Sequence, residues 1–250
     1  MPEGKPVPKR LALVALSLAV WSLALPAQAA DTYRQPVWFL WERSTLDVVI
    51  VPPAHGQLWN SGGVLGGQGV MEATPFNSYL AAIERAASDW RRAVDTFGPS
   101  WLRSGLVMRT YVVGRDNVPG SALLQPEIVV VTDETKGPLL GASISTRPCV
   151  ADSSSFYTAS FTPTDMYNVS LHEIGHCLGL DHATGPSSGK ITHDTMYASY
   201  GHTPGAAGTH SHCPSNLNVA GLERVFGPLF EKPGGGSVSM SSTDYKRITC

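Results

Sequence analysis

Residues 172–182 carry the side chains whose types and spacing most clearly predict chemistry. His172 and His176 are four positions apart, so on an α-helix they project from one face and could hold one metal ion. Glu173 follows the first histidine and would lie beside that metal. Gly179 stands where the chain must leave the helix, because glycine accepts the left-handed conformation that such an exit needs. The returning chain would then supply His182 as a third ligand.

Three imidazole ligands with an open fourth position are typical of a catalytic zinc site, whereas structural zinc sites are closed by four protein ligands. Zinc lowers the pKa of its bound water and polarises a carbonyl group. Glu173 would be the general base that takes the proton from the attacking water and passes it to the leaving amine. A histidine-rich helix without a metal is the alternative, and the added Gly179 and His182 argue against it. The pattern therefore predicts one catalytic Zn²⁺.

The same residues resemble the signature of the metzincin clan of zinc endopeptidases, in which a methionine turn follows the histidine motif. Met196 lies fourteen residues after His182 and is followed by Tyr197. Two segments, Gly179-Leu180-Asp181-His182 and Met196-Tyr197, are most similar to the matrixin branch. Ala183 and Ala198 depart from the serine and proline that are usual in that branch, so the resemblance to the clan is more specific than the resemblance to the branch.

The resemblance implies a fold of the α/β (α+β) class. A twisted mixed sheet with a parallel majority and two long helices would lie above a loop-rich C-terminal subdomain, with the zinc cleft between them. The N-terminal subdomain would comprise residues 30–179 and the C-terminal one residues 180–250. The loop around residues 183–215 would build the pocket that selects the residue after the cleaved bond.

Met196 and its neighbours have supporting roles under this interpretation. The resemblance places Met196 in the turn beneath the metal, although most methionines simply fill gaps in a core. Tyr197 or Tyr200 could place a phenol near the metal, while tyrosines are also common packing residues.

The first 29 residues predict a secretory signal peptide. A basic start precedes an apolar stretch at residues 11–25 and a small-residue cleavage site at residues 27–29. A retained anchor is the alternative, but fifteen apolar residues are short for a bilayer. We therefore expect a secreted, extracellular protein.

Length and charge exclude several classes of partner. The chain has 250 residues, 42% of them hydrophobic, and a net charge of −2, which suits one domain or two packed subdomains. No basic run predicts nucleic-acid binding, and no later apolar segment predicts a stable membrane anchor. We expect a monomer that acts on a protein or peptide substrate.

Four cysteines follow the predicted signal peptide, and an even number favours disulfides in an oxidising compartment. Three pairings are possible, and we expect Cys149–Cys177 and Cys213–Cys250. Cys177 is next to His176, but neighbours on a helix point about 100° apart, so Cys177 should not bind the same metal.

Apolar runs and periodicity predict the elements around the zinc helix. Strands are expected at residues 46–52, 106–113, 127–132 and 139–145, with an edge strand at 156–161. An apolar stripe predicts a helix over residues 77–97, and its members are Tyr79, Ile83, Ala86, Trp90 and Val94.

The zinc helix has a clear predicted start. Thr162 suits the N-cap, Pro163 suits the first turn, and Asp165 suits the positive end of the helix dipole. The apolar stripe opposite the metal ligands comprises Tyr167, Leu171, Ile174 and Leu178.

The remaining segments lack a strong periodic pattern. The glycine-rich residues 54–73 and the polar residues 183–215 predict loops. A short helix is expected at residues 217–226, followed by a flexible tail from residue 233. His210 and His212 could hold a second metal, although solvated loop histidines are commoner. Calcium is possible but unsupported, because no acidic cluster suggests a site.

Two other functional classes compete with a peptidase. One is a secreted zinc-binding interaction module without catalysis, which would not need the carboxylate of Glu173. The other is a structural cell-wall or matrix protein, which fits the glycine-rich loops but gives the histidine motif no role.

Overall fold

The computed structural model describes residues 31–51, 57–60, 63–66, 73–131, 149–152, 162–187, 189–197 and 212–250. The predicted signal peptide lies outside these ranges, as do the strands predicted at residues 139–145 and 156–161. Among the described helices, none combines the length and apolar character that a membrane span needs.

A four-stranded sheet forms the centre of the fold, with the strand order β5-β2-β6-β7. Its strands are β2 (Thr45–Val51), β5 (Val107–Val112), β6 (Ile128–Val131) and β7 (Cys149–Asp152). All three pairings are parallel, which suits the continuous apolar runs of β2 and β6, because parallel strands are usually covered on both faces. The strands predicted at residues 46–52, 106–113 and 127–132 are confirmed.

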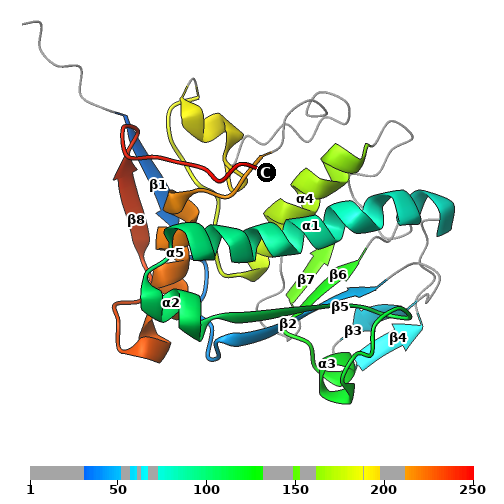
Figure 1. Ribbon diagram of the computed structural model, residues 1–250. Coiled ribbons are helices and arrows are strands. Elements are labelled where there is room, and N and C mark those ends of the chain that lie inside the picture. The colour runs from blue at the N-terminus through cyan, green and yellow to red at the C-terminus, as the bar shows by residue number, and fades with distance from the viewer. Residues whose placement is uncertain are drawn as a thin grey trace, which may run out of the picture.

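Helices cover both faces of this sheet (Figure 1). The long helices α1 (Ala73–Phe97) and α4 (Pro163–Cys177) lie together on one face, and α3 (Gly120–Leu124) lies on the other. Antiparallel pairing is found in separate two-stranded ribbons. The predicted α/β (α+β) class is therefore confirmed.

Two predictions need correction, one for the segment before α1 and one for the start of α1 itself. Residues 54–73 were expected to be a loop, but they contain an antiparallel hairpin of β3 (Gln57–Asn60) and β4 (Gly63–Gly66). Backbone hydrogen bonds can form such a hairpin without strong apolar alternation in the sequence. The helix predicted from residue 77 begins four residues earlier, at Ala73.

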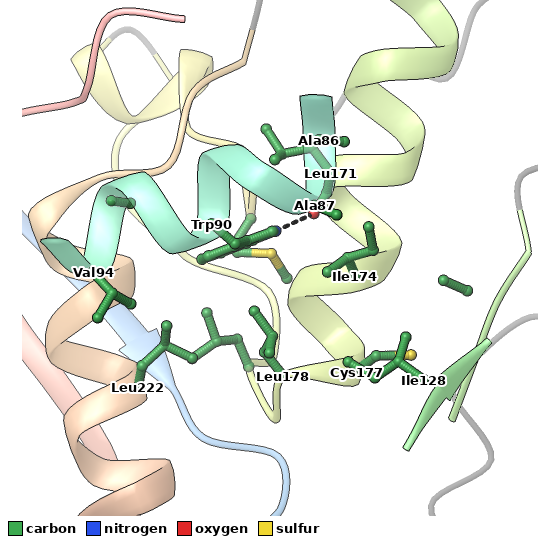
Figure 2. Packing of buried hydrophobic residues seen from close by; sticks show 14 of the residues in the cluster. Ala86, Ala87, Trp90, Val94, Ile128, Leu171, Ile174, Cys177, Leu178 and Leu222 are labelled. Carbon is green, nitrogen blue, oxygen red and sulfur yellow. Dashed lines mark hydrogen bonds between the residues drawn. The ribbon is translucent and has the colours of Figure 1, made fainter. Parts of the chain in front are cut away.

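The core lies between the sheet, α1 and α4 (Figure 2). The predicted apolar stripe of α1 is buried, and Trp90 is fully enclosed. The indole Nε1–H of Trp90 donates to the carbonyl oxygen of Leu171 at 2.8 Å. This hydrogen bond fixes the position of α1 on α4 and satisfies a polar atom that would otherwise be costly to bury.

The second half of the chain adds α5 (Asn216–Phe226) and the 3-10 turns η3 (Lys190–His193) and η4 (Gly227–Phe230). A short helix, α2 (Ser100–Gly105), joins α1 to β5. The helix predicted at residues 217–226 is thus confirmed within one residue.

The C-terminal tail is ordered where flexibility was predicted. Its strand β8 (Ser237–Ser241) pairs antiparallel with β1 (Thr32–Pro36). Gly235 and Gly236 have positive φ angles of 69° and 75°, so the glycine run forms the turn that leads into β8. The pairing joins two segments about two hundred residues apart, for which sequence periodicity carries no signal.

Both predicted disulfides are confirmed. Cys149 at the start of β7 is bonded to Cys177 at the end of α4, and Cys213 is bonded to Cys250. The two bonds indicate an oxidising environment. They fix α4 to the edge of the sheet and the last residue of the chain to the segment before α5.

Candidate metal centre

Helix α4 starts as its sequence predicts. Thr162 accepts a hydrogen bond from the backbone N–H of Asp165 at 3.2 Å, and Asp165 accepts one from the backbone N–H of Thr162 at 2.8 Å. This capping box satisfies two N–H groups that have no partner within the helix. Pro163 occupies the first turn, where its missing N–H costs nothing.

The chain turns away at Gly179, two residues after the end of α4, and two constraints require glycine there. Gly179 has a φ of 98°, which glycine adopts without the steric cost that other residues incur. A Cβ atom at this position would also lie 2.8 Å from the carbonyl oxygen of Phe39. The turn therefore sends the chain back toward α4 and close against the N-terminal segment.

The turn brings the three predicted ligands together. The Nε2 atoms of His172 and His176 are 3.0 Å apart, those of His176 and His182 are 3.2 Å apart, and those of His172 and His182 are 3.3 Å apart. Within the part of the chain that the structure describes, His172, His176 and His182 form a group of side chains close enough together to hold one metal ion.

Two hydrogen bonds determine which ring nitrogens face one another. The Nδ1 atom of His172 lies 2.6 Å from the carbonyl oxygen of Thr195, and that of His176 lies 2.8 Å from the carbonyl oxygen of Leu180. A carbonyl oxygen can only accept, so each Nδ1 carries a proton, and when the ring is neutral its lone pair is at Nε2. Two lone pairs at 3.0 Å repel each other unless a cation lies between them.

The distances suit a tetrahedral metal. With Zn–N bonds of 2.0–2.1 Å and tetrahedral angles, two nitrogen ligands lie about 3.3–3.4 Å apart. The observed separations of 3.0–3.3 Å are close to that value. Burial lowers the pKa of His176 to about 4, and the neighbouring His182 also lowers it. His176 is therefore neutral near pH 7, as metal ligation requires.

Glu173 accompanies the ligands on α4. It is partly buried and lies three positions before His176, so the two residues are neighbours on the helix surface. His172 and His176 are themselves buried. Glu173 therefore follows one helical ligand directly and lies within one helical turn of the other.

Met196 lies directly against α4. A Cβ atom at Gly175 would overlap the Sδ atom of Met196, so the thioether packs on the helix backbone between the two helical ligands. The backbone N–H of Ala183, which follows the third ligand, donates to the carbonyl oxygen of Met196 at 2.6 Å. Met196 is fully buried. The turn around Met196 thus contacts both α4 and the segment that follows His182.

The tyrosines after Met196 have different outcomes. Tyr197 is buried, with 7% of its surface exposed, and it forms a parallel bridge with Ala183. Tyr200 lies outside the described residues. Tyr197 is therefore a neighbour of the third-ligand segment.

Asp194 is a buried carboxyl group that the sequence did not single out. Its oxygens accept hydrogen bonds from the Met196 N–H at 2.8 Å and from Ser215, Asn218 and Tyr245 at 2.6–2.9 Å. Full burial raises the pKa of Asp194, and these donors oppose that rise. The network joins the methionine turn to the start of α5 and to the tail, and nothing in the local sequence pattern predicts it.

Gln35 of β1 is a second residue that sequence reasoning missed. Its fully buried side chain donates to the carbonyl oxygens of Asp181 and Pro36 at 2.5 and 3.0 Å, and it accepts from Asn218 at 2.9 Å. The neighbouring backbone is also paired, because the N–H of Asp181 donates to Pro36 at 3.1 Å. The N-terminal strand therefore holds the segment that delivers His182.

The candidate second metal position is only partly described. His210 lies outside the described residues, and His212 is buried, with 8% of its surface exposed. The expectation that His212 is solvated is therefore wrong. Its ring lies beside that of His193, with centroids 5.9 Å apart, and its backbone N–H donates to Asn168 at 2.9 Å.

Three imidazole rings from a helix and its exit turn converge on one point, with Glu173 on the same helix. No protein-family model matches this sequence, and no curated protein matches it either. What the site can do follows from its own chemistry. Nitrogen ligands in this geometry can hold a divalent metal ion of the transition series or zinc.

Proposed function

We propose that this protein is a secreted zinc-dependent endopeptidase of metzincin type, most similar to the matrixin branch, that hydrolyses peptide bonds. The observation that carries the proposal is the triangle of Nε2 atoms, 3.0–3.3 Å on each side, with Glu173 beside it on α4. The metal set of three histidines with an open fourth position is the arrangement of catalytic zinc. Cleavage of the first 29 residues and a monomeric state belong to the same proposal.

Backbone carbonyl groups orient two of the proposed metal ligands in the absence of substrate. The carbonyl oxygens of Thr195 and Leu180 hold the rings of His172 and His176 with their lone pairs directed at the metal position. Such outer partners orient the ligands and raise their basicity. All three histidines are neutral when they bind, so they leave the positive charge of the ion available to a developing oxyanion.

Glu173 carries the proton transfers. A zinc ion held by His172, His176 and His182 would supply a water of lowered pKa and a positive charge for the scissile carbonyl oxygen. Glu173 would accept the proton of that water as the water oxygen attacks the carbonyl carbon. It then donates the same proton to the amine nitrogen as the C–N bond breaks. The enzyme thus returns to its starting protonation state after each cleavage.

Zinc dependence tests this proposal. The purified protein without its signal peptide should contain one zinc ion per chain and should cleave a diverse quenched-peptide library. Removing the metal with a chelator should abolish cleavage, and one equivalent of Zn²⁺ should restore it. His182→Ala should reduce both zinc content and cleavage. Cleavage that persists in the fully demetallated protein would contradict the proposal.

A secreted zinc-binding interaction module without catalysis is the second candidate. It shares the same histidines and would bind zinc equally well. A module of this kind would show zinc binding without peptide cleavage, and its partner binding would not change on substitution of Glu173. The half-buried carboxyl group beside the ligands favours the enzyme.

A further inference from the structure

Residues 37–41, Val-Trp-Phe-Leu-Trp, form an apolar segment between β1 and β2 that lies against the exit of α4. Val37 forms an antiparallel bridge with Leu180. The backbone N–H of Trp38 donates to the carbonyl oxygen of Gly179 at 2.8 Å. The segment is therefore fixed to the turn that leads from the second metal ligand to the third.

Alternate side chains of this segment have different environments. Trp41 is buried, and its indole N–H donates to the carbonyl oxygen of Cys177 at 3.1 Å. Phe39 packs on Trp41, with ring centroids 5.6 Å apart. Trp38 and Leu40, by contrast, are 38% and 44% exposed. The alternation is that of an extended chain, in which residues i and i+2 face the same side.

The exposed indole is close to the metal centre. The rings of Trp38 and His176 meet edge to face, with centroids 5.6 Å apart and planes at 79°. A metal on the Nε2 atom of His176 would lie about 3 Å from the centre of that ring. The Trp38 indole is therefore within about 9 Å of the metal position, and an extended peptide covers that distance in about three residues.

Exposure of such side chains has a cost that a functional role would justify. The large hydrophobic residues exposed in the described part of the chain are Trp38, Leu40, Val107 and Leu229. Two of these four lie in one five-residue segment, and one of the two, Trp38, lies against His176. Exposed apolar groups gathered at one place mark interaction sites more often than scattered ones do.

We propose that Trp38 and Leu40 form a substrate subsite that binds a large apolar side chain within three residues of the cleaved bond. We call this pair the apolar shelf. It lies on the N-terminal segment, so it is distinct from the loop after the third ligand. Specificity arises because the shelf removes the substrate side chain from water near the reacting carbonyl. This inference rests on the proposed peptidase function.

A positional peptide series tests the shelf. Each of three positions on either side of the cleaved bond carries Phe, Leu or Ala in turn, and kcat/KM is measured for zinc-loaded wild type, Trp38→Ala, Trp38→Phe and Leu229→Ala. Wild type should prefer Phe or Leu over Ala at one position by about tenfold or more. Trp38→Ala should reduce that preference about fivefold or more, and Trp38→Phe should keep most of it.

Leu229→Ala is the matched control, because Leu229 is 37% exposed on η4 and lies outside the shelf. Its preferences should equal those of wild type. An unchanged preference in Trp38→Ala would overturn the proposal. If Trp38→Ala loses zinc, Leu40→Asp is tested instead, because Leu40 has no aromatic ring that could pack on His176. Leu40→Asp should reduce the same preference, and an unchanged preference would overturn the proposal.

Peptide hydroxamates separate this inference from the proposed function, because they bind the metal without being cleaved. Their dissociation constants are measured with Phe or Ala side chains at the preferred positions. A protein that binds zinc but cleaves no peptide would contradict the peptidase. The Phe-over-Ala affinity ratio, and its loss in Trp38→Ala, would still support the shelf. A ratio near one in wild type would overturn it.

Discussion

The Nδ1–H of His172 donates to the carbonyl oxygen of Thr195 at 2.6 Å, and Thr195 directly precedes Met196. The first predicted metal ligand is thus oriented by the turn around Met196, which also packs against α4. Any change that moves this turn should move the ring of His172. The turn is held in place by Asp194, through its hydrogen bond from the Met196 N–H at 2.8 Å.

Met196 should support both stability and metal affinity. Met196→Ala would leave a cavity beneath α4, because Met196 is fully buried, and should lower the free energy of unfolding by about 2–5 kcal/mol. Met196→Leu keeps the volume and should cost less than about 1.5 kcal/mol. Urea unfolding and zinc titration measure the two effects. Equal behaviour of the two variants would contradict this role of Met196.

Gly175 should tolerate no side chain. A Cβ atom there would overlap Met196 Sδ and lie 2.6 Å from Trp90 Cζ2, and such overpacking costs about 1–3 kcal/mol. The gain in helix propensity, about 1 kcal/mol, offsets only part of this cost. A Cβ atom at Gly120 would have nothing within 4 Å of it, so Gly120→Ala is the control. Denaturant unfolding should show Gly175→Ala destabilised and Gly120→Ala close to wild type.

Gln35 should influence zinc binding although it touches no ligand. Gln35→Leu removes the hydrogen bonds to Asp181 and Asn218 without opening a large cavity. The unsatisfied buried groups should destabilise the fold by about 1–3 kcal/mol, and the looser His182 segment should weaken zinc binding about tenfold or more. Competition with a chromophoric chelator measures the affinity. The exposed Gln125 provides the control variant Gln125→Leu. Equal zinc affinities of the two variants would show that Gln35 does not hold the His182 segment for zinc binding.

Alkaline pH should destabilise the protein through its buried tyrosines. Burial raises the pKa of Tyr245, and the nearby Asp194 carboxylate raises it further. Because the folded pKa is above the unfolded value of about 10, the stabilising contribution is complete below pH 10 and is lost as the pH rises. Each such tyrosine adds a slope of up to about 1.4 kcal/mol per pH unit.

Tyr245→Phe should remove the contribution of Tyr245 to the slope of the free energy of unfolding against pH. It should also lower stability at neutral pH, because the hydrogen bond to Asp194 is lost. Urea unfolding at a series of pH values between about 9 and 11 measures the slope. An identical slope in wild type and Tyr245→Phe would show that Tyr245 ionises equally in the folded and unfolded states, contrary to this prediction.

Local patterns predicted much of the candidate metal centre. The histidine spacing, the cap at Thr162 and the glycine exit at Gly179 are features of one helix and its ends, so short-range geometry determines them. The parallel strands β2 and β6 were predictable because their apolar runs are continuous. The even number of cysteines predicted two disulfides, but the sequence alone allowed three pairings, of which the structure shows the expected one.

Long-range contacts were not predictable in the same way. Gln35 reaches Asp181 across 146 positions, and Tyr245 reaches Asp194 across 51, so no periodicity connects either pair. Strand β8 is short and rich in serine, and its partner β1 determines its conformation. Gly175 occupies a variable position of the histidine motif, and only the packing of Met196 gives it a role.

The most direct test of the central claim compares wild type with Glu173→Ala and Glu173→Gln, each loaded with one zinc ion. We expect all three proteins to bind zinc with similar affinity, because Glu173 is not a ligand. Cleavage of a quenched-peptide library should fall by a factor of about 10² or more in both variants. Equal cleavage by wild type and both variants, or zinc-loaded wild type that cleaves no peptide, would contradict the account.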